Sequence, residues 1–141
     1  FLVIRQGDYC VCLHREEGHF PVKVFTTNVG ERRLLGIGAG GLALMAALPY
    51  AEIEHPMERH ALDYAQVGFT PARMAQAVRQ TRKAGYADIT DTITTGVSGV
   101  GRTFAASATT LAAISFGAIT PRLPAARKKE MAQLLIDQLP R

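Results

Sequence analysis

The sequence predicts an α+β fold, an antiparallel sheet packed against helices, and three observations support this. Strand-like alternation opens the chain within residues 1–27, helical patterns fill residues 42–84, and two further strand-like runs precede a last helix. Strands and helices are therefore grouped along the chain, which favours an α+β sheet over an alternating βαβ fold. With 141 residues, the chain has the length of one ordinary domain.

The first 30 residues predict an antiparallel meander of three strands. Residues 1–6 and 9–14 are rich in apolar and β-branched side chains, and the turn pair Gly7-Asp8 between them indicates a hairpin. Residues 22–27 alternate in a similar way. They predict a third strand, which ends at Asn28-Val29-Gly30.

Two helices are expected directly after the glycine-rich segment. Leu42 to Leu48 is apolar on every side and consists of good helix formers, so we expect a helix that is buried all round. Pro49 ends this helix. An amphipathic helix is expected over residues 50–62, with a kink or an interruption at Pro56.

The helix expected over residues 70–84 has clear signals at both ends. Thr70 is an N-cap residue followed by Pro71 at the first helical position, and Gly85 supplies the C-terminal stop. Its buried stripe has helical spacing and consists of Met74, Ala77, Val78 and Thr81.

The last third of the chain predicts a hairpin and a closing helix. Residues 97–105 and 110–116 are strand-like, and residues 106–109 form the short connection between them. A shorter strand is expected at Tyr86. Leu123-Pro124 then opens a helix that runs to about Leu139, and its apolar face is expected to contain Ala126, Met131, Leu134, Leu135 and Gln138.

Composition excludes a membrane-spanning helix and argues against direct DNA recognition. The longest apolar run, Leu42 to Pro49, has eight residues, whereas a membrane span needs about 20. The formal charge is +4, but the basic residues are scattered, and only Arg32-Arg33 and Arg127-Lys128-Lys129 are adjacent. Because Phe1 lies in the middle of a strand pattern, we interpret the chain as a fragment of a longer protein.

Cysteine and histidine residues predict no metal site. Cys10 and Cys12 are too close in sequence for an easy disulfide and too few for a zinc site, and they favour a reducing cytoplasm. The four histidines lack the spacing of metal ligands; they are His14, His19, His55 and His60. We expect neither a metal nor a cofactor.

Serine and aspartate residues give no signature of an enzyme. The segment Gly96-Val97-Ser98-Gly99 echoes a nucleophile elbow, but the strand-to-helix turn of that motif is missing, so we expect no catalytic residues. Asp88 and Asp91 fit a polar loop and a functional site equally well. Ser115 lies in the middle of an apolar strand and would need a buried partner or a ligand.

A glycine-rich segment precedes the first expected helix. Gly36-x-Gly38-x-x-Gly41 matches the dinucleotide fingerprint literally, but the strand before it and the acidic residue about 20 positions later are missing. Two interpretations remain open. The backbone amides where the helix starts, near Gly41, suit a small carboxylate, or the glycines only allow a buried helix to pack against the sheet.

The succession of these segments resembles a known family, the effector-binding domain of IclR-type bacterial transcriptional regulators. The resemblance covers about four fifths of the chain, from Gly30 to the C-terminus. It is carried by Gly30-x-Arg32-x-x-Leu35, Ala39-x-Gly41-x-Ala43-Leu44, Leu48-Pro49, Thr70 with its helix ending in Gly85-Tyr86, Gly96-Val97, and Ala112-Ala113-Ile114-Ser115.

The resemblance implies a GAF-like fold with an antiparallel sheet of about six strands flanked by helices. It implies that residues 1–141 form a single effector-binding domain and that an N-terminal winged helix-turn-helix domain, absent from this chain, reads the DNA. The partners implied are a small organic acid effector and further copies of the chain, as a homodimer or a dimer of dimers, in the cytoplasm.

The resemblance also implies where the effector binds. In relatives that sense small oxo-acids, the effector sits over the glycine-rich loop, and the corresponding positions here are Gly38, Ala39, Gly40, Ile89, Gly99, Ser115 and Gly117. This chain carries Ile89 in place of an acid, Gly99 in place of a larger side chain and Gly117 in place of a second serine. These smaller and less polar residues predict a roomier, more apolar pocket for an aromatic or branched acid.

The expected function is therefore that of a ligand-sensing and oligomerising domain that modulates operator binding by a transcriptional regulator such as a repressor. Two other classes remain as alternatives. One is a small α+β hydrolase-like enzyme that uses Ser98 or Ser115 with a histidine, and the other is a GAF-type module that senses a nucleotide.

Overall fold

The computed structural model describes residues 1–21 and 27–140, and these residues form the expected α+β fold. Six strands form one sheet in the order β3-β2-β1-β6-β5-β4, and all neighbouring strands are antiparallel. The strands are β1 (Leu2–Gln6), β2 (Tyr9–His14), β3 (Arg32–Leu34), β4 (Ala87–Thr90), β5 (Val97–Ala105) and β6 (Leu111–Ile119). The helices are α1 (Ala39–Ala46), α2 (Tyr50–Arg59), α3 (Ala61–Gln66), α4 (Pro71–Ala84), the short 3₁₀ helix η1 (Thr120–Arg122) and α5 (Ala125–Gln138).

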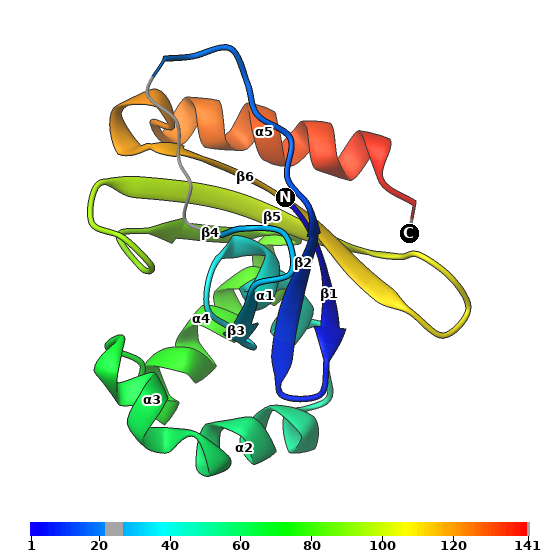
Figure 1. Ribbon diagram of the computed structural model, residues 1–141, viewed down its shortest axis with the longest axis vertical. Helices are drawn as coiled ribbons and strands as arrows, with labels where there is room; N and C mark the ends of the chain where they lie inside the picture. The colour runs from blue at the N-terminus through cyan, green and yellow to red at the C-terminus, as the bar shows by residue number, and fades with distance from the viewer. Residues whose placement is uncertain (22–26, 141) are drawn as a thin grey trace.

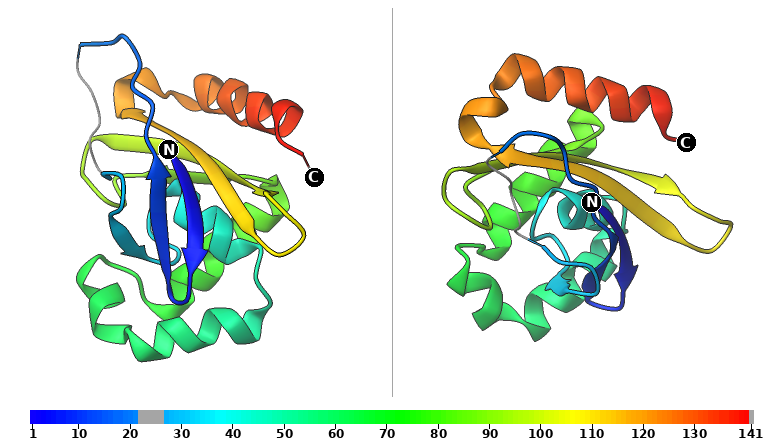
Figure 2. Two further views of the ribbon diagram at one scale, coloured as in Figure 1. Left: turned by 45° about the vertical axis from the view of Figure 1, so that its right-hand side comes forward. Right: turned by 45° about the horizontal axis from the view of Figure 1, so that its top comes forward.

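Helices cover both faces of the sheet (Figure 1). On one face α1 packs against β1, β5 and β6, and α4 packs against α1 from outside. On the opposite face α5 crosses the sheet over β5. The turned views show α2 and α3 beside the turn of the β1–β2 hairpin (Figure 2). None of the helices described is long and apolar enough to cross a membrane.

The N-terminal hairpin is confirmed. β1 pairs with β2 from Gln6 opposite Tyr9 outward, and Gly7 in the turn has a φ of 61°, which favours glycine. The strand predicted over residues 22–27 lies almost entirely outside the described residues. The third strand that the structure does show is β3, which pairs with β2 and whose sequence, Arg-Arg-Leu, gave no strand signal.

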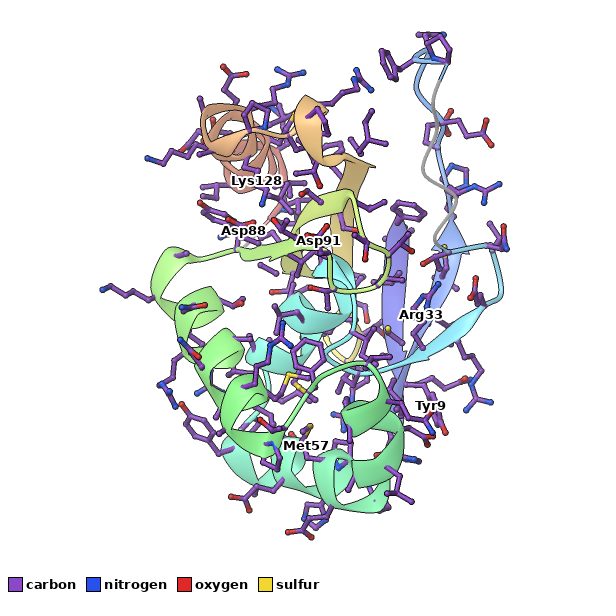
Figure 3. The ribbon with its side chains drawn as sticks, turned by 90° about the vertical axis from the view of Figure 1, so that its left-hand side faces the viewer. Tyr9, Arg33, Met57, Asp88, Asp91 and Lys128 are labelled. Atoms are coloured by element: carbon purple, nitrogen blue, oxygen red, sulfur yellow. The ribbon has the colours of Figure 1, made fainter. Side chains whose placement is uncertain are left out.

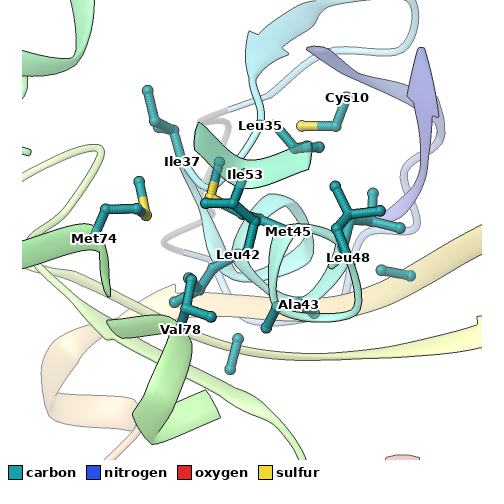
Figure 4. Packing of buried hydrophobic residues seen from close by; sticks show 14 of the residues in the cluster. Cys10, Leu35, Ile37, Leu42, Ala43, Met45, Leu48, Ile53, Met74 and Val78 are labelled. Carbon is teal, nitrogen blue, oxygen red and sulfur yellow. The ribbon is translucent and has the colours of Figure 1, made fainter. Parts of the chain in front are cut away.

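Helix α1 is the centre of the hydrophobic core (Figure 4). All of its residues are buried, as the lack of polar positions predicts, but it begins at Ala39 and ends at Ala46 rather than covering residues 42–48. Leu44 and Met45 have no exposed surface. The side chains packed around the helix include Leu35, Ile53, Met74 and Val78.

Carbonyl groups at the C-terminal end of α1 accept hydrogen bonds from an arginine of another helix. The Arg82 guanidinium on α4 donates a hydrogen bond from Nε to the Ala46 carbonyl at 2.8 Å and a second, from Nη2, to the Leu48 carbonyl. The same guanidinium lies 4.3 Å from the centre of the Tyr50 ring. Arg82 therefore joins α4 to the end of α1 and supplies partners for carbonyls that a helix end leaves unpaired.

The predicted helix over residues 50–62 is two helices, and Pro56 is not where they separate. Pro56 lies buried inside α2, and the break falls at His60. There the Asp8 carboxylate, from the β1–β2 turn, accepts hydrogen bonds from Arg59 at 2.6 and 2.7 Å and lies 3.0 Å from His60 Nε2. These contacts tie the hairpin turn to the end of α2.

The contacts of Asp8 with the two side chains have a consequence for stability. Hydrogen bonding by Arg59 is the main cause that lowers the pKa of Asp8 from 3.8 to about 2. Because the pKa of Asp8 is lower in the folded protein, its ionised carboxyl group raises the free energy of unfolding. This contribution is present above pH 3.8 and is lost as the pH falls toward 2.

The helix α4 is confirmed in its ends and its buried face. The Thr70 hydroxyl accepts a hydrogen bond from the Arg73 amide at 3.1 Å, and Gly85 ends the helix with a φ of 84°. Met74, Val78 and Thr81 are buried, as their spacing predicts.

The C-terminal hairpin is confirmed as β5 and β6, and the face predicted for the closing helix α5 is confirmed at Leu135 but is wrong at Ala126, Leu134 and Gln138, which are exposed. Leu134 is 46% exposed, and the buried residues are Ala132 and Leu135. These two continue a stripe that begins at Lys128, whose side chain is only 12% exposed because its ammonium group reaches Asp88 at 2.6 Å. A lysine marks the inner face of α5, and apolarity alone therefore does not reveal it.

We expect the replacement Arg82→Ala to lower the free energy of unfolding by about 1–2 kcal/mol, because two backbone carbonyls lose a charged donor. The matched control is Arg79→Ala, an exposed arginine of the same helix. Urea denaturation of both variants tests this expectation. Equal stability of the two variants would show that Arg82 contributes nothing to the end of α1.

Candidate functional site

A cavity lies between the N-terminal end of α1 and the strands β4, β5 and β6. All seven residues that the sequence analysis selected for the effector site line it. They come from four separate parts of the chain: the start of α1 (Gly38, Ala39 and Gly40), β4 (Ile89), β5 (Gly99) and β6 (Ser115 and Gly117).

Glycines bring α1 into direct contact with the sheet. A Cβ atom at Gly101 would lie 2.7 Å from the Ala39 carbonyl oxygen, and one at Gly99 would lie 3.4 Å from the Ala39 side chain. On the helix, a Cβ atom at Gly40 would lie 2.7 Å from Val3. The first turn of α1 therefore rests on the backbone of β5 and beside β1, so these glycines do serve packing.

The same contact places the start of α1 at the cavity. Gly38 precedes the helix with a φ of 84° and gives it no side-chain cap. The first intrahelical hydrogen bond runs from the Leu42 amide to the Gly38 carbonyl, so the amides of Ala39, Gly40 and Gly41 have no partner within the helix. These backbone groups line the cavity and favour a negatively charged ligand atom.

Ser115 is the buried polar side chain beside these amides. It is 7% exposed, and its Oγ lies 3.5 Å from the position of a Cβ atom on Gly40. Its backbone pairs with Phe1, which also lines the cavity: the Ser115 amide donates to the Phe1 carbonyl at 3.0 Å. The hydroxyl of Ser115 is thus held next to the first turn of α1.

Several residues of the cavity were missed by the sequence analysis. On one side it is lined by Arg33, Glu31 and Thr27, and the Arg33 guanidinium lies 3.1 Å from Thr27 Oγ1 and 3.3 Å from the Glu31 carboxylate (Figure 3). Arg33 was missed because β3 was not predicted. The side-by-side cysteines on β2 also line the cavity, and burial raises the pKa of Cys10 to about 11, so its thiol is neutral.

The two aspartates left open by the sequence analysis have structural partners outside the cavity. Asp88 accepts a hydrogen bond from Lys128 on α5 (Figure 3). Asp91 has a φ of 59°, and its carboxylate accepts a hydrogen bond from the Gly96 amide. Between them, Ile89 turns to the opposite side of β4 and lines the cavity.

Among the residues that the structure describes, no hydrogen bond joins a serine side chain to a histidine. The Ser98 hydroxyl, fully buried, lies 3.3 Å from Thr90 Oγ1 and 3.1 Å from Thr120 Oγ1. The ring of His60 lies beside Asp8, at the hairpin turn. Within residues 1–21 and 27–140, no three His, Cys, Asp or Glu side chains are grouped as metal ligands.

The cavity is narrow. Its volume is about 60 Å³, although the side chains at positions 89, 99 and 117 are as small or apolar as expected. The space is limited by Ile93, from the loop at residues 91–96, which reaches toward the start of α1. The prediction of a roomier pocket rests on positions 89, 99 and 117, and Ile93 in this loop lies outside those positions.

Comparisons with known proteins identify a family. The chain matches the family model described as bacterial transcriptional regulator IclR C-terminal over residues 1–138. No curated protein sequence matches the chain.

Solved structures share the fold. The effector domain described for an IclR regulator from Acinetobacter superimposes with a TM-score of 0.83 at 16% identity, over 96% of this chain and 80% of that chain. IclR from Thermotoga maritima gives 0.81 at 17% identity over 98% of this chain, and the Agobacterium tumefaciens repressor BlcR gives 0.72 at 18% identity over 95%. This chain spans just over half of the last two, 57% and 54%.

The contact between α1 and β5 gives a prediction about how the cavity is built. We expect Gly101→Ala to destabilise the protein by about 1–3 kcal/mol, because the added methyl group would meet the Ala39 backbone at 2.7 Å. Gly18→Ala is the matched control, since a Cβ atom there meets nothing within 4 Å. Thermal unfolding measures both variants, and an unchanged Tm for Gly101→Ala would contradict the close contact.

Proposed function

This chain belongs to the IclR C-terminal family of bacterial transcriptional regulators, whose members are regulators and not enzymes, and from that premise we propose a specific role for it. It is the ligand-sensing and oligomerising domain of a DNA-binding regulator, and its ligand is a small organic acid. The acid binds in the cavity at the start of α1 and changes how the regulator binds its operator.

The observation that carries this proposal is the meeting of all seven candidate residues around the first turn of α1. Unpaired amides at Ala39 and Gly40 receive the carboxylate of the ligand, and the neighbouring Ser115 hydroxyl donates a further hydrogen bond. The positive end of the helix favours an anion at this point.

The remainder of the cavity suits the body of a small acid. Ile37, Ile89 and Val97 offer apolar surface, whereas Arg33 and Glu31 offer charge at one side. An aromatic or branched acid would place its apolar part against the isoleucines only where the cavity widens beyond about 60 Å³. A nucleotide is far larger than a cavity of about 60 Å³, so the geometry favours an acid over the nucleotide-sensing alternative.

The assignments of DNA recognition, repression, location and assembly rest on the family and on the finding that this chain spans just over half of two longer relatives. We assign operator recognition to an N-terminal winged helix-turn-helix domain outside this chain, and we assign repression, cytoplasmic location and assembly as a homodimer or dimer of dimers to the whole regulator. An effector acts by binding one arrangement of the linked domains more tightly than the other.

We expect this chain alone to bind operator-like DNA no better than a nonspecific basic protein, because its basic residues are scattered. Gel-shift measurements at physiological salt test this, and a sequence-specific shift at nanomolar concentration would contradict it.

We also expect this chain to self-associate, because symmetric assemblies are common among such regulators. Sedimentation of the same sample tests this, and a monomer throughout the micromolar range would contradict it.

Ser115→Ala is expected to weaken binding of an acid effector by up to about tenfold, because the ligand loses one hydrogen bond of roughly 0.5–1.5 kcal/mol. Titration calorimetry with pyruvate and α-ketoisocaproate measures the affinity. These two acids carry the same oxo-acid group and differ in their apolar part.

The control is Ser107→Ala, which changes an exposed serine of the β5–β6 connection. A melting temperature for each variant separates lost folding from lost binding. If Ser115→Ala stays folded and binds the acids as tightly as the unchanged protein, Ser115 is not a ligand contact. If neither acid binds the unchanged protein, the proposed class of effector is wrong.

A further inference from the structure

One side chain that lines the cavity comes from a loop rather than from a helix or a strand. Ile93 lies in the loop at residues 91–96, between β4 and β5. It lines the cavity and packs, half-buried, against the hydrophobic core. Its Cδ1 atom lies 3.0 Å from the position of a Cβ atom on Gly38, the residue that precedes α1.

The walls formed by the start of α1, β1 and β5 are held by close contacts of the backbone. The first turn of α1 is pressed against β5 at Gly99 and Gly101, and Gly40 is in contact with Val3. These walls belong to the sheet and to a helix that is buried on every side. An enlargement of the cavity on these sides would require separation of α1 from the sheet, which would break the core.

The loop that carries Ile93 is closed at its base. Asp91 and Gly96 both have positive φ values, 59° and 84°, and the Gly96 amide donates to the Asp91 carboxylate. The Asp91 amide also donates to the Val97 carbonyl at 2.9 Å. Because these bonds join the two ends of the loop, residues 91–96 can move outward as one unit, Gly96 included, while Thr90 and Ser98 stay paired.

The outer side of the loop is held by backbone hydrogen bonds, since the Val97 amide donates to the Thr94 carbonyl at 3.2 Å and the Thr120 amide donates to the Gly96 carbonyl at 2.7 Å. Thr94, Thr95 and Gly96 are exposed to solvent, whereas the inward-facing Ile93 is half-buried. The contact of Ile93 with the cavity and the core is therefore the main apolar contact that an outward movement would break.

We propose that Ile93 determines the size of ligand that this cavity accepts, and that larger acids bind by displacing its loop. This inference rests on the proposed function, since it concerns the same cavity. With Ile93 in place, about 60 Å³ holds on the order of five non-hydrogen atoms, which suits the smallest oxo-acids. A branched acid needs the volume that Ile93 occupies.

Displacement of the loop would also reach the other face of the sheet. The Gly96 carbonyl accepts a hydrogen bond of 2.7 Å from the Thr120 amide. Thr120 is the first residue of η1, which leads into α5. Acids of different size in one cavity would thus place the start of α5 differently, which is a way for the domain to distinguish them.

The first experiment compares pyruvate with α-ketoisocaproate, which has an isobutyl group in place of the methyl group. We expect Ile93→Ala to raise the affinity for α-ketoisocaproate about tenfold and to leave that for pyruvate within about twofold. Thr95→Ala, an exposed change in the same loop, is the matched control. Ile93→Val is a milder variant and should give a smaller shift in the same direction.

A second experiment detects movement of the loop directly. The chain contains no tryptophan, so Thr95→Trp supplies a single fluorescent reporter on the loop. We expect α-ketoisocaproate to change its emission and pyruvate to leave the emission unchanged.

The outcomes separate the two proposals. Binding of both acids with the same ratio of affinities in the unchanged protein and in Ile93→Ala would overturn the role of Ile93. Equal emission changes with both acids would overturn the displacement of the loop. No binding of either acid to either protein would overturn the proposed function and, with it, this inference.

Discussion

The complete burial of α1 is the constraint on which the rest of the structure depends. A helix with no exposed face must find partners for the polar groups at both of its ends within the protein. At the C-terminal end, Arg82 supplies them from α4. At the N-terminal end, Gly38 offers no side-chain cap, and the unpaired amides line a cavity instead. The binding site that we propose is thus the unsatisfied end of the central helix of the core.

The two interpretations of the glycine-rich segment are compatible because one contact serves both. The glycines at 40 and 101 allow the first turn of α1 to lie so close to β1 and β5 that an added Cβ atom would come within 2.7 Å of Val3 or of Ala39. That approach buries the helix, and it also places the helix amides next to Ser115 on β6. Packing and ligand binding therefore use the same residues, and loss of stability alone does not distinguish the two roles.

The sequence predicted those elements whose ends or periodicity are determined by residues close together in the chain. An example is α4, which begins after Thr70 and ends at Gly85. The prediction failed where a distant partner decides the structure. Lys128 lies on the inner face of α5 because Asp88 on β4 receives its ammonium group, and α2 continues through Pro56 until His60 meets Asp8. The same holds for the candidate site. The glycine-rich segment and Ser115 could be selected from the sequence, whereas Arg33 could not, because it lies on β3, a short charged strand that is defined by its pairing with β2.

A sensor needs a part that responds to its ligand and a part that does not. Here the walls made by α1, β5 and β1 are held by backbone contact, so a ligand can change little on those sides. The wall that we propose to move is the loop at residues 91–96, whose Gly96 carbonyl is bonded to Thr120 at the start of η1. On the same side, Lys128 joins α5 to Asp88 and Thr90 of β4. A ligand that shifts this loop would therefore act on the end of the sheet that is bonded to α5. Coupling between two sites requires that the ligand makes different contacts in the two arrangements of the domain, and a shift of this loop would supply such a difference.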